Sequence, residues 1–180
     1  MLEILIPGGE LWDERNQMFI TTEAQVLKLE HSLVSLSKWE SRWCKPFLTK
    51  EDKTDEETLD YIKCMTITQN VSPETYLFLT RENNIQIQNY INAPMTATTF
   101  PKDNSKGGGR EIVTAELIYY WMIALNIPLE WEKRHLNRLL ALIRVCNIKN
   151  APPKKHSTKD IMSRNAALNA ARRQQLNSRG

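Results

Sequence analysis

Charge is divided unevenly along this chain of 180 residues, and that division limits what the chain can fold into. Residues 149–180 contain eight of the 24 lysines and arginines but only one acid, Asp160. Residues 1–148 therefore hold 16 bases against 20 acids. This pattern predicts an acidic, compact body over 1–148 and a basic linker with a helical arm over 149–180. Because isolated helices of this length are marginal in water, we expect the arm to become ordered only when it docks on the body or on a partner.

The composition is typical of a soluble protein with one sizeable core. Apolar residues make up 41% of the chain, which is enough for one domain and an extension. The three cysteines are odd in number and widely spaced, which argues against a disulfide framework and for a reducing compartment. The apolar run at the N-terminus is too short for a signal peptide. The most apolar stretch, 112–129, is broken by Glu116, Asn126 and Pro128, so we expect a buried helix there and no membrane span.

The N-terminal residues, about 1–30, are predicted to form a β element. Short apolar runs on either side of a polar turn favour a small hairpin or a three-stranded sheet, over 2–6, 11–12, 18–20 and 25–29. Such a sheet is only marginally stable alone and must pack on the helices that follow, about 35–146. The sequence thus predicts an α+β fold that is predominantly α-helical, with a small N-terminal hairpin or sheet packed on a helical body and a basic C-terminal helical arm.

Capping signals and apolar periodicity place the helices. Helix starts are predicted at the capping boxes Ser37–Glu40, Thr54–Glu57 and Ser157–Asp160, and at Ser72 before Pro73. The periodic apolar pattern predicts helices over 80–91, 111–125, 129–145 and 158–176. Residues 93–110, which include two prolines and three consecutive glycines, are interpreted as an exposed, mobile loop.

The helices predicted over 111–125 and 129–145 superficially resemble a DNA-binding helix-turn-helix. However, Glu130 and Glu132 would face DNA phosphates at the start of the second helix. An antiparallel helix pair in the core is therefore the favoured interpretation.

No residue pattern in the chain indicates catalysis or metal binding. The cysteines and histidines form no pair at metal-ligand spacing, and Gly107–Gly109 lack the lysine of a phosphate-binding loop. Nucleophile elbows, kinase signatures and paired carboxylates are also missing from the sequence. We therefore expect a protein without enzymatic activity, cofactor or metal. A perturbed cluster around His31 or His135 in a deep pocket would argue otherwise.

Two tryptophans are predicted to be core residues and a third is predicted to bind a partner. Trp39 and Trp121 lie at helical spacing beside apolar residues, which is typical of a core. Trp131 lies beside a charged stripe, so we expect it to be exposed or interfacial. Together with Arg134 and Arg138, it forms a candidate aromatic and charged binding surface.

The basic arm is the strongest signal of binding in the sequence. Its cations suit either DNA phosphates or an acidic groove on a protein, and a solvated tail is an equally open interpretation. Apolar residues such as Ile161, Leu168 and Leu176 predict a narrow apolar face along the arm. The candidate partner-binding residues are Lys149, Lys154, Lys155, Lys159, Arg164, Arg172, Arg173 and Arg179.

Four stretches of the sequence are similar to those of a known protein family. They are His31–Ser41, Tyr119–Ile123 with Asn126–Pro128, His135–Leu140 running into Ile143–Asn147, and Asn165–Arg173. Together they resemble a family of small proteins from the structural gene clusters of tailed bacteriophages and prophages of Gram-positive bacteria. The resemblance runs from about residue 10 to the C-terminus.

The resemblance implies a non-enzymatic role in phage morphogenesis. The first expectation is a tail assembly chaperone, which holds the tape-measure protein until the tail tube polymerises around it. A virion component of the neck or tail also fits the resemblance. For a tail assembly chaperone, the resemblance implies a short form and a frameshifted long form of the protein. The implied partners are the tape measure, tail or neck subunits and further copies of this chain, in the host cytoplasm during assembly or in the virion. A DNA-binding packaging or regulatory protein that uses the arm is the second alternative, and its binding would weaken steeply with salt.

Overall fold

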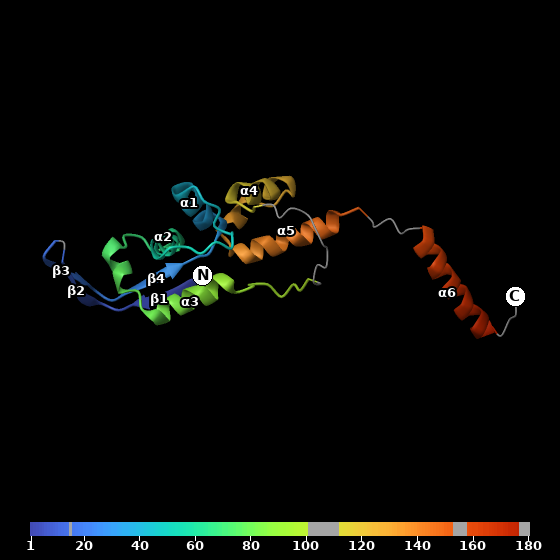
Figure 1. Ribbon diagram of the computed structural model, residues 1–180, viewed down its shortest axis with the longest axis horizontal. Coiled ribbons are helices and arrows are strands. Elements are labelled where there is room, and N and C mark those ends of the chain that lie inside the picture. The colour runs from blue at the N-terminus through green and yellow to red at the C-terminus, as the bar shows by residue number, and fades with distance from the viewer. Residues whose placement is uncertain (15, 101–111, 153–157, 177–180) are drawn as a thin grey trace. The chain divides into compact units, whose positions relative to one another are not determined.

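The computed structural model describes residues 1–14, 16–100, 112–152 and 158–176 (Figure 1). It confirms the predicted α+β fold, because a short antiparallel β element precedes a predominantly helical body. The chain divides into two compact units, Met1–Cys146 and Asn147–Gly180.

The β element is one long, interrupted hairpin. Strand β1 (Leu2–Ile6) pairs antiparallel with β4 (Gln25–Leu29), and β2 (Gly9–Asp13) pairs antiparallel with β3 (Met18–Thr22). Both pairs keep the same register, so the two small sheets are successive halves of the same hairpin. The sequence prediction of a hairpin or a three-stranded sheet is therefore resolved in favour of the hairpin.

The hairpin is interrupted at Pro7 and Gly8. Proline has no backbone N–H to donate to a β-ladder. At Gly8 the opposite strand comes so close that a Cβ atom would lie 2.8 Å from both the Ala24 nitrogen and the Thr22 oxygen. The more buried positions are even-numbered in β1 (Ile4 and Ile6) and odd-numbered in β2 (Gly9 and Asp13), so the alternation of burial changes phase at this break.

Two hydrophobic clusters hold the first unit together. In the first, the inner face of β1 and β4 packs on helices α2 (Asp55–Met65) and α3 (Arg81–Asn92) and on Trp39. Figure 1 shows α3 lying alongside β1, and the side-chain amide of Asn83 donates to the Leu5 carbonyl at 3.1 Å. Trp39 is buried, so its predicted place in the core is confirmed.

The second cluster joins three helices. Helix α1 (Leu33–Trp43) packs beside α4 (Ala115–Ala124), as Figure 1 shows, and α5 (Leu136–Asn150) completes the cluster. Its buried members include Leu33, Leu36, Ile118, Met122, Leu136, Leu139 and Ile143. Helix α1 therefore contributes to both clusters and connects them.

Glu40 on α1 links the two clusters through its carboxylate. One oxygen accepts the backbone N–H of Phe47 at 2.8 Å, and the other accepts that of Ala115 at 2.7 Å. The side chain is buried. This carboxylate therefore fixes the chain that leaves α1 and the first residue of α4 to the same point.

The capping signals in the sequence predict some helix starts correctly and misplace others. Thr54 caps α2 in the predicted box with Glu57, and Thr80 caps α3. The predicted start at Ser37–Glu40 is wrong, because α1 begins at Leu33 behind a reciprocal box of Ser32 and Ser35. Two serines three residues apart supply the same pair of capping hydrogen bonds as Ser and Glu.

Several predicted helices differ from the observed ones. After Ser72 the chain forms a short 3-10 helix, η1 (Pro73–Phe78), and the Ser72 hydroxyl bonds the Glu74 side chain instead of capping the backbone. Helix α4 begins only at Ala115, behind the cap of Thr114.

The single helix predicted over 129–145 is wrong. A 3-10 turn, η2 (Leu129–Lys133), ends before Arg134, and α5 starts at Leu136. Between them His135 forms a β-bridge with Ser32, and the Leu136 N–H donates to the His31 carbonyl at 2.7 Å. A tertiary contact has thus replaced the intrahelical bonds that periodicity predicts.

The second unit contains helix α6 (Thr158–Leu176), which coincides with the helix predicted over 158–176. The predicted box begins at Ser157, which lies outside the described residues. Of the loop predicted over 93–110, residues 93–100 contain neither helix nor strand, and the remainder lies outside the described residues.

Candidate protein-binding surfaces

Helix α4 is apolar apart from Glu116, yet only one side of it is covered. Ala115, Ile118 and Met122 face the second hydrophobic cluster and are buried. On the opposite side Tyr120 and Ile123 are 63% and 76% exposed. Surface helices normally present polar residues to water, and a helix that is apolar all round is normally buried all round. The outer face of α4, defined by Tyr120 and Ile123, is therefore a candidate binding surface.

An apolar groove lies beside the same helix. It has a volume of about 460 Å³ and a mostly apolar lining. Its lining residues are Leu48, Thr49, Lys50, Ile112, Val113, Trp121 and Leu140. Trp121, predicted as a core residue, is half-buried and packs against the second cluster while it also lines this groove.

The distal half of the hairpin exposes a pair of aromatic rings. Trp12 and Phe19 are cross-strand partners, 51% and 64% exposed, and their ring centroids are 4.9 Å apart in an edge-on arrangement. Another exposed apolar pair, Leu5 and Val26, lies across β1 and β4. Figure 1 shows the β2–β3 end extending past η1. The hairpin thus presents apolar side chains to water on its outer face.

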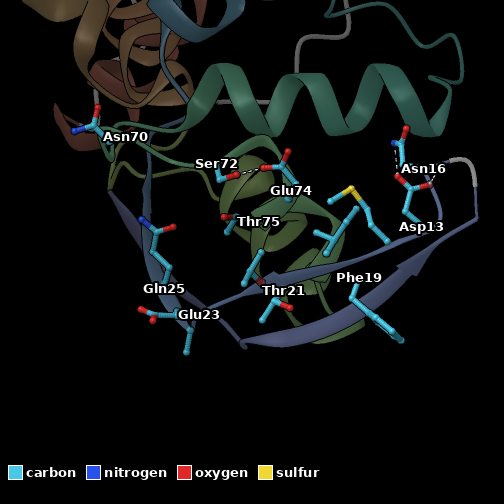
Figure 2. A pocket seen from close by; sticks show the side chains of 14 residues that line it. Asp13, Asn16, Phe19, Thr21, Glu23, Gln25, Asn70, Ser72, Glu74 and Thr75 are labelled. Carbon is cyan, nitrogen blue, oxygen red and sulfur yellow. Dashed lines mark hydrogen bonds between the residues drawn. The ribbon is translucent and has the colours of Figure 1, made fainter.

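The inner face of the distal hairpin borders a second, more polar cavity, called here the hairpin groove. It has a volume of about 690 Å³ and lies between β3 and the segment 70–75 that leads into η1. Figure 2 shows Asp13 and Asn16 at one end, Gln25 and Asn70 at the other, and Phe19 pointing away from it. Apolar side chains of β3, including Met18 and Ile20, form part of its wall.

The charged side chains that line the hairpin groove are all acidic among the described residues. They are Asp13, Glu23 and Glu74. Asp13 accepts the side-chain amide of Asn16 at 2.7 Å, and Glu74 is bonded by the Ser72 hydroxyl. The hydroxyl oxygen of Thr22, also on the groove wall, is buried without a hydrogen-bond partner. The groove therefore combines negative charge with apolar surface.

The predicted surface around Trp131 is only partly exposed. Trp131 is half-buried and packs against the second cluster, and the Arg138 guanidinium lies 5.7 Å from its ring centroid. Arg134 is exposed at the end of η2. Tyr119 donates to Glu132 at 2.9 Å on the same surface. Trp131 and Arg138 thus contact each other, and Trp131 also packs against the core.

The basic arm is exposed wherever it is described. Lys149 lies at the end of α5, and Arg164, Arg172 and Arg173 lie on α6 with exposed side chains. Lys159 belongs to α6, but its side chain is not among those described. Lys154, Lys155 and Arg179 lie outside the described residues.

The apolar residues of α6 do not form the narrow face that the sequence predicts. Apolar and basic side chains are distributed around the helix, with Arg172 among the leucines and Arg164 and Arg173 on either side. Along the described part of the arm every side chain is exposed. A partner that covers the leucines of this helix would therefore also meet its arginines.

His31 and His135 are buried together at the junction of the two hydrophobic clusters. Their ring centroids are 5.1 Å apart. His31 shares a hydrogen bond of 2.6 Å with the Tyr61 hydroxyl, and His135 donates through Nε2 to the Tyr90 carbonyl at 3.0 Å. Burial, with a smaller contribution from the neighbouring His135, lowers the pKa of His31 to about 4. Burial likewise lowers the pKa of His135.

These histidines hold the polypeptide in place. The Asn137 N–H donates to His135 Nδ1 at 3.3 Å, so both ring nitrogens of His135 have backbone partners. Neither histidine lines any of the cavities described above. The cluster that the sequence singled out as a potential catalytic site is thus a buried polar junction with structural partners.

Other chemical groups add no ligand cluster. Cys44, Cys64 and Cys146 are free thiols. Within the described residues, no three histidines, cysteines or acids come together at a distance suited to a metal ion. None of the helices in the described part of the chain combines the length and hydropathy that a membrane span requires.

Comparison with known protein families, with curated proteins and with solved structures finds no match to this chain.

Sequence reasoning missed the outer face of α4, the exposed aromatic pair and the two grooves. The signal for the outer face of α4 was present, because Glu116 is the only charged residue of that helix. The signal for the aromatic pair was the position of Trp12 and Phe19 on either side of a polar turn. Both patterns also fit buried residues, so only the tertiary structure shows that they are exposed.

Proposed function

We propose that this protein is a non-enzymatic bacteriophage morphogenesis protein that acts as a tail assembly chaperone. It holds an apolar, helical segment of the tape-measure protein against the outer face of α4 and the apolar groove beside that helix. The observation that carries the proposal is the exposure of Tyr120 and Ile123 on a helix whose only charged residue is Glu116.

The geometry of α4 fits the binding of a helical client. Tyr120 and Ile123 are three residues apart, so they lie on one face of the helix. The adjoining groove adds apolar lining from Val113, Trp121 and Leu140. Apolar helical segments are commonly recognised by surfaces of this kind, in which one helix lays its apolar face into a groove. The resemblance of the sequence to proteins of phage structural gene clusters supports the choice of a tape-measure client.

A virion component of the neck or tail is the second candidate. The observation that favours it is the exposed aromatic pair Trp12 and Phe19 at the end of the hairpin, which would suit a permanent contact with a neighbouring subunit. The two candidates differ in whether the protein remains in the particle. Quantitative mass spectrometry of purified particles and of the lysate separates them. A chaperone is abundant in the lysate and missing from particles, whereas a component occurs at a fixed ratio to the portal.

Client binding is tested by co-expression with the tape-measure protein encoded in the same gene cluster. Ile123→Asp places a charge on the outer face of α4 without touching the buried face, and we expect it to reduce co-purified tape measure about tenfold or more. Ile85→Asp, which makes the same change at an exposed isoleucine on α3, serves as the matched control. Full retention of the tape measure by the Ile123→Asp chain would contradict the proposed binding surface.

DNA binding through the arm is tested by its salt dependence. Contacts to phosphates weaken by orders of magnitude as salt rises across the physiological range, whereas apolar client binding changes little. We expect tape-measure binding to persist at high salt and to be unaffected by Arg172→Glu with Arg173→Glu. Loss of tape-measure binding in that variant would indicate that the binding site lies on the arm and not on α4.

A further inference from the structure

The hairpin groove and the arm carry opposite charges. Asp13, Glu23 and Glu74 line the groove, and no basic side chain among the described residues does so. The described arm presents Arg164, Arg172 and Arg173, all exposed. Every copy of the chain therefore carries one acidic, partly apolar groove and one basic helix.

We propose that the hairpin groove binds the basic helix α6 of a second copy of this chain, so that copies associate head to tail. The interface is heterologous, because the groove of one copy meets the arm of the next and each copy keeps one free groove and one free arm. Such contacts extend into chains or close into rings. This self-association goes beyond the proposed function and does not involve the outer face of α4.

The surfaces are complementary in more than charge. Met18 and Ile20 on the groove wall offer apolar contact to the alanines and leucines that lie between the arginines of α6.

The charge distribution of α6 also favours a groove over a flat surface. At about 100° per residue, Arg164 and Arg173 lie at the two edges of the half of the helix that carries Arg172, so a flat partner would reach only some of these cations. A groove with carboxylates on the hairpin side, at Glu23, and on the η1 side, at Glu74, meets cations on two sides of the helix. Such complementary charge chiefly sets orientation and partner choice.

The proposal is tested with full-length chains by sedimentation velocity at several concentrations and at low and high salt. One variant reverses the groove (Glu23→Lys with Glu74→Lys), and the other reverses the arm (Arg172→Glu with Arg173→Glu). We expect concentration-dependent association of the unchanged chain at low salt, weakened at high salt. Each variant alone should associate with an affinity at least about tenfold lower than that of the unchanged chain, because like charges then face each other.

The deciding sample is a mixture of the two variants. The intact arm of the groove variant fits the intact groove of the arm variant, and the acidic arm of the arm variant faces the basic groove of the groove variant, so opposite charges meet at both contacts. We expect mixing to restore concentration-dependent association in which the two variants alternate. A matched control, Glu10→Lys with Glu82→Lys, reverses two exposed acids that do not line the groove, and it should associate like the unchanged chain.

Three results would overturn the proposal. The first is an unchanged chain that stays monomeric at all concentrations at low salt, and the second is undiminished association of either variant. The third is a mixture that stays monomeric although thermal unfolding shows both variants to be folded. Tape-measure binding is measured separately, so these results leave the role of α4 unaffected.

Discussion

The buried carboxylate of Glu40 is expected to contribute strongly to the stability of the fold. Its two oxygens accept the N–H groups of Phe47 and Ala115, and Ala115 is fully buried. Glu40→Ala removes both acceptors at once. A buried donor that loses its partner costs about 1–3 kcal/mol, so we expect the free energy of unfolding to fall by about 2–6 kcal/mol.

Glu40→Gln gives the matched intermediate. The amide keeps one oxygen, but its NH₂ group replaces the other acceptor and faces an N–H, so one donor loses its partner. We expect a loss of about 1–3 kcal/mol for this variant, which places it between the unchanged chain and Glu40→Ala. Because whole domains are stable by only about 5–15 kcal/mol, the alanine variant should lie close to the limit of folding.

Urea unfolding followed by tryptophan fluorescence measures both changes, with Glu82→Ala at an exposed position on α3 as the control. Hydrogen exchange adds a local readout, since the Ala115 amide should lose protection in both variants more than the amides of α2 do. A loss below about 0.5 kcal/mol for Glu40→Ala, which is the range of ordinary surface substitutions, would refute the assigned role.

Two further predictions concern the core. His31 has a folded-state pKa of about 4, below that of an unfolded histidine, so the unfolded state binds more protons as the pH falls. Stability should therefore be level above about pH 6.5 and decrease by up to about 1.4 kcal/mol per pH unit toward pH 4, and His31→Gln should flatten this slope in urea titrations. A slope unchanged by the substitution would assign the pH dependence to other groups. Leu139 is fully buried whereas Leu140 is half-buried at the apolar groove, so Leu139→Ala should cost about 2–5 kcal/mol and Leu140→Ala clearly less. Equal losses in chemical denaturation would show that Leu140 is a core residue instead.

Local signals in the sequence predicted those helix ends that depend on local contacts. The box of Thr54 and Glu57 was found because both capping bonds close within four residues. The start of α1 was misplaced because Ser32 with Ser35, and Ser37 with Glu40, are both plausible local boxes. Burial of Leu33 and Leu36 in the second cluster decides between them, and the sequence does not show which residues that cluster will contain.

The sequence alone determined the broad plan of this protein: a short antiparallel β element, a helical body and a basic helix after it. Those features follow from the distribution of charge along the chain and from local apolar periodicity, both of which can be read without knowing the tertiary contacts. Only the tertiary structure decided which apolar side chains meet water. The periodic pattern of α4 is the same whether one side or every side is covered, and the break at His135 follows from a β-bridge to Ser32, about a hundred residues earlier in the chain. The candidate binding surfaces on the body are the apolar and acidic faces that the tertiary contacts leave exposed to water.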